Sequence, residues 1–471
     1  MIDRRNFIKA GAAATLAVPF ATLALAKVEP GVFELRAQKA SISLAGVKYG
    51  ASNLWLYNGE TPGPEIRVSQ GDRVRVRFTN ELDEPTSIHW HGIRIENAMD
   101  GVAGLTQDPV QPGDSFDYDF IVPDAGTFWY HAHKKSWEQV ARGLYGPLIV
   151  DESEPSFDRD HDITLTIDDW RLGRDGTLQL ASLGAFMDWT HAGRLGNWVT
   201  TNGKSQPEFE LKTGENYRIR LINASNARIL QISPKKMGAR VLGFDGFVFD
   251  EVGDSPERLV LTPAQRVDLL ISASSVGDKA MTEVGDFALE ELSGRNALHI
   301  AKFKFVESSG DLAKPVILRP NNVKLPDLAN AKRMPLVMAG GAMGRLGKIV
   351  FEGKELNNDD IERTKQVWTF NGVANLAKAP FFSIERGETV IIETENQTGW
   401  LHGMHVHGHH FQVVSLNGNE LEEKHWRDTF IIDRKETVGI AFVADNPGKW
   451  LFHCHMLEHA AAGMTTWFEV T

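Results

Sequence analysis

The stretch most suited to chemistry lies close to the C-terminus and carries the only cysteine of the chain. It reads His453-Cys454-His455-Met456-Leu457-Glu458-His459, followed by Gly463-Met464. A thiolate with imidazole and thioether partners at close spacing suits a type 1 blue copper site, which transfers one electron at a time. Side chains alternate faces along an extended strand, so His453 and His455 would point away from Cys454. One strand could then serve two metal centres.

Three further groups of histidines support this interpretation. They are His89-Trp90-His91-Gly92, His131-Ala132-His133 and His402-Gly403-Met404-His405-Val406-His407-Gly408. Each H-x-H pair can direct two imidazoles to the same side of a strand. The four pairs together offer eight imidazoles, enough for a cluster of three copper ions. Zinc sites usually close at four ligands and need no such excess, so zinc is the weaker alternative, as is a buried free cysteine among surface histidines.

These four motifs resemble the copper motifs of the multicopper oxidases, a group that includes laccases and bacterial copper-efflux oxidases. They extend from His89 to Met464, which is nearly the whole chain. The resemblance implies four copper ions per chain. It implies type 1 ligands His402, Cys454 and His459 with Met464 axial, type 2 ligands His89 and His405, and type 3 ligands His91, His131, His133, His407, His453 and His455.

One position departs from the family pattern. Gly403 stands where the family usually has proline between the first two histidines of the third motif. Glycine loosens the local backbone, but the change removes no ligand. The remaining histidines are interpreted as surface, core or supporting residues; they are His161, His191, His299, His409, His410 and His425.

An internal repeat indicates the fold that positions these motifs. Three segments begin with glycine and an acidic residue, alternate like half-buried strands and end on asparagine; they start at Gly71, Gly214 and Gly387. Each follows an Asn-Gly turn by a similar gap, at Asn58, Asn202 and Asn371. The pattern predicts an all-β protein of three Greek-key β-sandwiches. In the resembling family this unit is the cupredoxin domain.

The repeat also suggests where the domains begin and end. We expect cupredoxin-like domains at 27–152, 153–310 and 336–471, with a polar, proline-containing linker at 311–335. The H-x-H pairs fall in the first and third domains, and Ala132 takes the place in the first that Cys454 has in the third. A three-copper cluster would then lie between these two domains, with the second as spacer and wall.

The N-terminus indicates export. Residues 1–26 carry Arg4-Arg5, then an almost uncharged run ending in Ala24-Leu25-Ala26. This order is typical of a cleaved signal read by the twin-arginine export machinery, which implies the periplasm. The alternative is a membrane anchor, but the run is short of the ~20 residues needed to span a bilayer. We therefore expect no stable membrane insertion after cleavage.

Charge narrows the range of partners. Removing this segment, whose net charge is +2, from a chain of net charge −12 leaves −14. Such an acidic protein is unsuited to nucleic acid or to anionic membrane surfaces.

Two carboxylates are candidates for proton transfer. Asp100 follows the first motif and Glu458 lies inside the last. Reduction of O₂ consumes protons, which such groups could relay; the alternative is that each only orients a histidine through a hydrogen bond.

The sequence as a whole predicts a laccase-like oxidase. A reductant, either a phenol, an aromatic amine or a metal ion, would give single electrons that reduce O₂ to water. A cuprous oxidase of copper tolerance is the alternative, although the eleven methionines form no Met-rich insertion. A non-catalytic copper-binding or scaffold member of the fold is disfavoured because every ligand is present. The length and the complete ligand set exclude a two-domain nitrite reductase.

Overall fold

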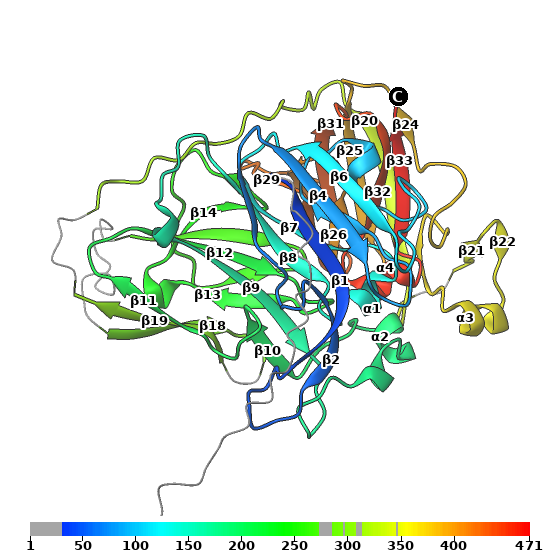
Figure 1. The fold of residues 1–471 in the computed structure, drawn as a ribbon. Helices are drawn as coiled ribbons and strands as arrows, with labels where there is room; N and C mark the ends of the chain where they lie inside the picture. The colour runs from blue at the N-terminus through cyan, green and yellow to red at the C-terminus, as the bar shows by residue number, and fades with distance from the viewer. Residues whose placement is uncertain (1–30, 273–284, 295–296, 308–312, 345–346) are drawn as a thin grey trace, which may run out of the picture.

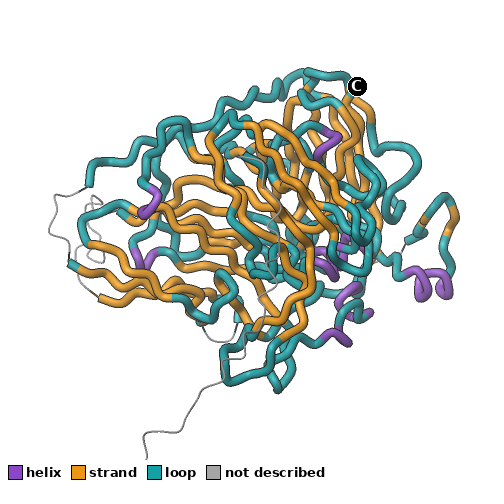
Figure 2. The backbone as a smooth tube through the Cα atoms, in the orientation of Figure 1, coloured by secondary structure: helices purple, strands orange, loops and turns teal. Residues whose placement is uncertain are grey.

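The computed structural model describes residues 31–272, 285–294, 297–307, 313–344 and 347–471. Strands dominate these residues and the helices are few and short (Figures 1 and 2). The predicted all-β fold is therefore confirmed. The predicted signal segment, 1–26, lies outside the described residues. Within the described ranges, no helix is both long and apolar enough to cross a bilayer.

The first third of the chain forms two sheets around a common core, with strand orders β2-β1-β4-β6 and β3-β8-β7-β5. In β4 the side chains alternate, with Val74, Val76 and Phe78 buried and the intervening arginines exposed. The strands are β1 (Phe33–Ile42), β2 (Ser52–Tyr57), β3 (Ile66–Ser69), β4 (Arg73–Asn80), β5 (Ile88–His91), β6 (Ser115–Ile121), β7 (Gly126–Ala132) and β8 (Tyr145–Asp151).

The middle third forms two sheets of its own, shown in green in Figure 1. Their strand orders are β10-β9-β12-β17-β14-β15 and β11-β19-β18-β13-β16. The strands are β9 (Asp162–Trp170), β10 (Trp198–Thr201), β11 (Glu208–Lys212), β12 (Tyr217–Asn223), β13 (Leu230–Ser233), β14 (Arg240–Phe244), β15 (Phe247–Val248), β16 (Leu259–Leu261), β17 (Arg266–Ile271), β18 (Gly285–Glu291) and β19 (Leu298–Val306).

The last third again forms two main sheets, with orders β23-β20-β25-β31-β27-β28 and β24-β33-β32-β26-β30; β29 also pairs with β27. The strands are β20 (Lys332–Gly340), β23 (Trp368–Phe370), β24 (Ser383–Ile384), β25 (Thr389–Asn396), β26 (His402–Val406), β27 (Phe411–Leu416), β28 (Asn419–Glu420), β29 (Trp426–Arg427), β30 (Thr429–Ile432), β31 (Thr437–Val443), β32 (Gly448–Cys454) and β33 (Thr465–Val470). β20 begins inside the segment 311–335 that the sequence suggests as a linker.

Short helices and one hairpin complete the fold. The hairpin of β21 (Val350–Phe351) and β22 (Lys354–Glu355) projects from the body together with α3 (Figure 1). The helices are α1 (Ser136–Gln139), α2 (Phe186–Thr190), α3 (Asn358–Thr364) and α4 (Leu457–Ala461), with 3₁₀ turns η1 (Asn97–Met99), η2 (Arg159–His161), η3 (Leu180–Ser182) and η4 (Lys235–Met237).

The repeat seen in the sequence is a structural repeat. Strands β4, β12 and β25 each pair in parallel with the first long strand of their third, namely β1, β9 and β20. Each ends on an asparagine whose side-chain oxygen accepts a hydrogen bond from the amide two residues on. The side-chain amide of each asparagine also donates a hydrogen bond to the backbone carbonyl four or five residues later in the chain. The three asparagines are Asn80, Asn223 and Asn396.

The Asn-Gly turns repeat as well. Asn58, Asn202 and Asn371 all have positive φ, between 49° and 53°. Each side chain accepts a hydrogen bond from one backbone amide of the neighbouring strand and donates to a carbonyl two residues earlier in that strand. These turn residues tolerate a left-handed conformation, which explains why the same pair recurs.

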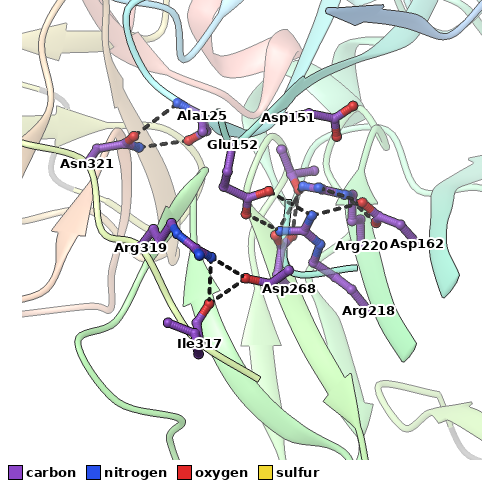
Figure 3. A network of polar contacts seen from close by, with 12 residues as sticks. Ala125, Asp151, Glu152, Asp162, Arg218, Arg220, Asp268, Ile317, Arg319 and Asn321 are labelled. Atoms are coloured by element: carbon purple, nitrogen blue, oxygen red, sulfur yellow. Dashed lines mark hydrogen bonds and ion pairs between the residues drawn. The ribbon is translucent and has the colours of Figure 1, made fainter. Parts of the chain in front are cut away.

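One expectation about the repeat is wrong. The alternation predicts half-buried strands, yet β12 is buried along its whole length. Arg218 and Arg220, which would face water, instead bind carboxylates between the first and middle thirds (Figure 3). Arg220 Nε lies 2.7 Å from Asp162, and Arg218 Nη1 lies 2.5 Å from Glu152. Burial alone would raise the pKa of Asp162, but the surrounding guanidinium groups lower it.

The first and last thirds share a hydrophobic core. A single cluster of buried side chains includes Trp90 and Phe128 from the first third and Trp450 and Phe452 from the last, whereas the middle third has a separate core. The connection at 313–331 contains no helix or strand. Asn321 fixes it to the first third through two hydrogen bonds with the backbone of Ala125, at 3.0 and 2.7 Å (Figure 3).

Candidate metal centres

Two pairs of neighbouring strands position the histidines. In the first third β5 lies beside β7, with His89 opposite His131. In the last third β26 lies beside β32, with His405 opposite His453 and Met404 opposite Cys454. Because cross-strand neighbours on one face lie close together, each strand pair directs its imidazoles to a common side.

The two strand pairs bring eight imidazoles into contact. The groups whose nitrogens lie within 4.8 Å of one another are His89, His91 and His405; His91, His131 and His455; and His133, His407 and His453. Every group combines histidines from the first and last thirds of the chain. Seven of these side chains are buried, and His133 is partly exposed.

The spacing of the nitrogens fits bound metal. Nε2 of His407 lies 3.1 Å from Nε2 of His453, and Nε2 of His131 lies 3.4 Å from Nε2 of His455. Two nitrogens that each lie about 2 Å from one ion at a tetrahedral angle are about 3.3 Å apart. Four nitrogens in the cluster are buried and have no hydrogen-bond partner in the described chain: His89 Nε2, His91 Nδ1, His405 Nε2 and His455 Nδ1. Buried polar atoms are normally paired, so the first three of these nitrogens suit metal ligands, whereas His455 already directs its Nε2 toward His131.

Burial keeps the imidazoles neutral. Desolvation, followed by the charges of neighbouring rings, lowers the pKa of most cluster histidines well below the usual value; these are His91, His131, His133, His405, His407 and His455. Burial lowers the pKa of His453 to about 4. A metal binds the unprotonated form of imidazole, so the lowered pKa values of these seven rings favour metal binding.

Hydrogen bonds orient the rings. His89 Nδ1 donates to the carbonyl of Asp100 at 2.8 Å, and His407 Nδ1 lies 3.1 Å from the carboxylate of Asp100. His405 Nδ1 donates to the carbonyl of Asp428 at 2.9 Å. Each bond fixes Nδ1 as the donor, which leaves Nε2 unprotonated as the ligand atom.

A separate group surrounds the cysteine. Cys454 Sγ lies 3.6 Å from Nδ1 of His402 and 3.9 Å from Nδ1 of His459, and all three side chains are buried. The far nitrogens are fixed: His402 Nε2 lies 2.8 Å from Thr398 Oγ1, and His459 Nε2 donates to the carbonyl of His191 at 2.6 Å. Burial raises the pKa of the thiol to about 12, so metal binding would release a proton.

Met464 lies next to this group. Its side chain is buried in the same apolar cluster as Cys454. The amide of Cys454 donates to the carbonyl of Met464 at 3.0 Å. The backbone of Met464 is therefore next to Cys454, and a soft, uncharged thioether beside a thiol and two imidazoles is the ligand chemistry of a blue copper site.

Close packing against the middle third explains why position 403 is a glycine. A Cβ at this position would lie 2.7 Å from Cβ and Oγ1 of Thr262 in the middle third. The close approach leaves no space for a side chain, so glycine allows the middle third to pack against β26.

The two predicted carboxylates lie in different surroundings. Asp100 contacts the imidazole cluster through His407. Glu458 is fully buried, but its oxygens accept hydrogen bonds from the Asn226 side chain at 2.8 Å and the Arg194 amide at 3.2 Å. Burial raises the pKa of Glu458 to about 7. Glu458 therefore connects the last motif to the middle third.

Several supporting residues had no signal in the sequence. Asp428 contacts a histidine of the imidazole cluster, and Thr398 and the His191 backbone contact the two histidines beside Cys454. Of the histidines given a supporting or structural interpretation, His409 and His410 are buried and contact the backbone of His407 and Gly92. Among the described residues, neither belongs to a group of side chains that could hold a metal ion. Nothing in the local spacing distinguishes Asp428 from other aspartates, because its partners come from distant segments.

Comparison with known proteins agrees with this chemistry. Family models described as multicopper oxidase match residues 37–155 and 353–471. The multicopper oxidase MmcO of Mycobacterium tuberculosis is 29% identical over 92% of this chain and 85% of its own length. Laccase-1 of Botryotinia fuckeliana is 28% identical over 92% and 80%.

A solved structure extends the likeness to the whole fold. The multicopper oxidase of Pseudomonas thermotolerans is 32% identical, covers 93% of this chain and 99% of its own, and superposes with a TM-score of 0.79. The chain therefore belongs to the multicopper oxidase family and is a copper-dependent oxidoreductase that uses O₂ as its electron acceptor.

Proposed function

We propose that the chain is a laccase-like oxidase that holds four copper ions. His402, Cys454 and His459 would hold the type 1 ion, together with the thioether of Met464. His89 and His405 would hold the type 2 ion, and the type 3 pair would be held by His91, His131, His133, His407, His453 and His455. When bound, copper supplies one-electron redox chemistry at the first site and activation of O₂ at the second.

The observation that carries this proposal is the division of β32 between two sites. Cys454 lies against His402 and His459, whereas its neighbours His453 and His455 lie against histidines of the imidazole cluster. Consecutive residues therefore join the site that would receive electrons to the site that would use them. Four one-electron oxidations of the donor, with four protons, reduce one O₂ to two waters.

The chain's own residues exclude water and deliver protons. All eight imidazoles of the cluster are assigned to metal, so they are not available as acids. Asp100, in contact with His407, and Glu458, beside His459, are the proposed proton carriers. A carboxylic acid can transfer a proton to a reacting group that lies within hydrogen-bond reach, either directly or through one water.

The donor would bind where the type 1 site comes closest to the surface. His459 donates to the carbonyl of His191, and the partly exposed ring of His191 lies 5.5 Å from the ring of Trp400. Aromatic edges of this kind suit phenols and aromatic amines. We favour such organic donors, with metal ions as further reductants.

Two exposed methionines support a second candidate, a cuprous oxidase. Met187 and Met343 are 61% and 77% exposed. The α2 segment and the 341–344 turn that carry them are joined by the hydrogen bond from the Ala342 amide to the Thr190 carbonyl, at 2.7 Å. Thioethers prefer Cu(I), so this surface also suits a cuprous donor.

Export remains part of the proposal. Residues 1–26 would be a twin-arginine signal that sends the folded protein to the periplasm. Arg4 and Arg5 are the residues on which this proposal depends.

Parallel oxygen-uptake measurements test the function. Copper-loaded enzyme would receive a phenol, an aromatic amine, Cu(I) or Fe(II) as donor, with Met187→Leu/Met343→Leu as the matched variant. We expect uptake with the organic donors in both proteins. A loss in the variant confined to Cu(I) would favour the cuprous oxidase, and no uptake with any donor would contradict the proposed function.

A further inference from the structure

The middle third contributes no histidine to the cluster, yet one of its arginines lies directly behind it. Arg266 begins β17 and is completely buried. Its Nη1 and Nη2 donate to the two carboxylate oxygens of Asp428, at 2.8 and 2.5 Å. A two-pronged bond between planar charged groups is strong and directional, so Arg266 fixes both the position and the plane of the Asp428 carboxylate.

Asp428 in turn contacts two histidines of the cluster. Its carboxylate accepts from Nε2 of His91 at 3.2 Å, and its backbone carbonyl accepts from Nδ1 of His405 at 2.9 Å. The opposite nitrogens, His91 Nδ1 and His405 Nε2, are the buried atoms without hydrogen-bond partners in the described chain. Asp428 therefore determines which nitrogen of each ring faces the metal position.

The middle third holds this aspartate from more than one side. Asp245 accepts from the Arg266 amide at 3.0 Å, and its other oxygen lies 3.3 Å from the Thr429 amide. The Gln265 side chain donates to the carbonyl of Thr429 at 3.0 Å. The turn from Ala264 to Arg266 and the turn at Asp245 thus enclose the start of β30.

The same arginine reaches the first third. Its Nε donates to the carbonyl of Thr127 in β7 at 3.0 Å. A Cβ on Gly92, the residue after His91, would lie 2.5 Å from Arg266 Nη2 and 2.6 Å from Asp428 Oδ2. Glycine at this position lets the backbone beside a cluster histidine pack directly on the ion pair.

We propose that Arg266 is a positioning residue for the imidazole cluster, acting through Asp428 on His91 and His405. This inference rests on the proposed function, because it assigns those two histidines to copper. Without the guanidinium group, the buried Asp428 carboxylate would lose the cation that bridges both of its oxygens and would turn from the direction that His91 requires. The middle third would then control the geometry of copper ions that it does not bind.

Copper retention tests the proposal independently of turnover. Arg266→Met keeps much of the side-chain volume and removes the charge. Arg218→Met is the matched control, since Arg218 is also buried and bound to carboxylates, of Glu152 and Asp162, on a neighbouring strand. Each copper-loaded protein would be titrated with a copper chelator while the type 2 electron paramagnetic resonance signal and the blue absorption are recorded.

We expect the chelator concentration that removes half of the type 2 copper to fall 10–100-fold in Arg266→Met, as for other residues that orient metal ligands. The hyperfine pattern of that signal should change, while the blue absorption is retained. Asp428→Asn should give the same signature. Arg218→Met should lose thermal stability yet keep the wild-type chelator midpoint and signal.

Two outcomes would overturn the proposal: a wild-type midpoint and signal in folded Arg266→Met, or an equal change in Arg218→Met. If Arg266→Met does not fold, Arg266→Lys decides, because an ammonium group keeps the charge but cannot bridge both oxygens in the same way. A wild-type midpoint in that variant would also refute the role. A wild-type enzyme without any type 2 signal would instead contradict the proposed function, which keeps the two failures distinct.

Discussion

Glu458 accepts a hydrogen bond from Asn226, 232 positions earlier in the chain, at a distance of 2.8 Å. This contact ties the residue before a proposed type 1 ligand to the middle third. Glu458→Gln preserves the shape and one of the two accepted hydrogen bonds but removes the proton. We expect turnover to fall by roughly 10²–10⁴-fold, with copper content and reduction of the blue site by donor intact. Reoxidation of the reduced variant by O₂ at the wild-type rate would show a purely structural carboxylate.

The raised pKa of Glu458 also predicts how stability varies with pH. Between its unfolded value of about 4.5 and its folded value of about 7, the folded state holds a proton that the unfolded state has lost. Stability therefore falls as pH rises through this window, by about 3 kcal/mol from this group. In urea titrations of copper-free protein, Glu458→Gln should gain stability relative to wild type from pH 5 to pH 8. A constant difference would contradict the buried, protonated state.

Asp100 offers a second test of proton delivery. Its carboxylate lies 3.1 Å from Nδ1 of His407. Asp100→Asn keeps a polar group there but cannot carry the proton, so turnover should again fall by roughly 10²–10⁴-fold. The measurement is reoxidation of the fully reduced enzyme by O₂, with copper content as the control. Loss of copper from the variant would instead assign Asp100 to ligand orientation.

Removing the thiol separates the two metal sites. Cys454→Ser should abolish the intense visible absorption and steady-state turnover, because the type 1 site depends on thiolate. The remaining three copper ions should stay bound, since no cluster histidine changes. Elemental analysis and the visible spectrum check this prediction. A variant that keeps the blue band would mean that Cys454 does not bind copper.

Met464 tests the axial position. Met464→Leu exchanges a weak thioether ligand for a hydrocarbon of similar size, which favours Cu(I) over Cu(II). The potential of the type 1 site should rise and the protein should remain blue. Redox titration gives the answer, and an unchanged or lower potential would place the axial interaction elsewhere.

The arginine pair tests export. Replacing Arg4 and Arg5 by lysine should leave the precursor in the cytoplasm, because the pair is read by the export machinery and takes no part in the fold. Fractionation of cells that produce each precursor measures the effect. Wild-type activity in the periplasm from the double variant would indicate another route.

The sequence predicts the local parts of this structure well. The face on which His453 and His455 lie follows from strand alternation, and the three asparagines of the repeat make the same bonds because the same short pattern recurs. Such features depend on residues a few positions apart. The all-β fold and the gathering of the H-x-H pairs follow from patterns of this kind.

The parts that were not predictable depend on distant packing. Arg266 meets Asp428 across 162 positions, and no local pattern indicates this contact. The sequence indicates only that Gly403 loosens the backbone. The structure shows that a side chain at this position would clash with Thr262. The full burial of β12 depends on carboxylates from other strands, which its own alternation does not reveal.

The joining of first and last thirds in every imidazole group has a consequence for biosynthesis. Met464 lies 375 positions after His89, and His453 and Cys454, at the end of β32, lie shortly before it. A ribosome must therefore translate both the first and the last third before the imidazole cluster can assemble. A product that stops before β32 keeps the histidines of the first third but lacks Cys454 and the histidines on either side of it, so it can complete neither the cysteine site nor the imidazole cluster.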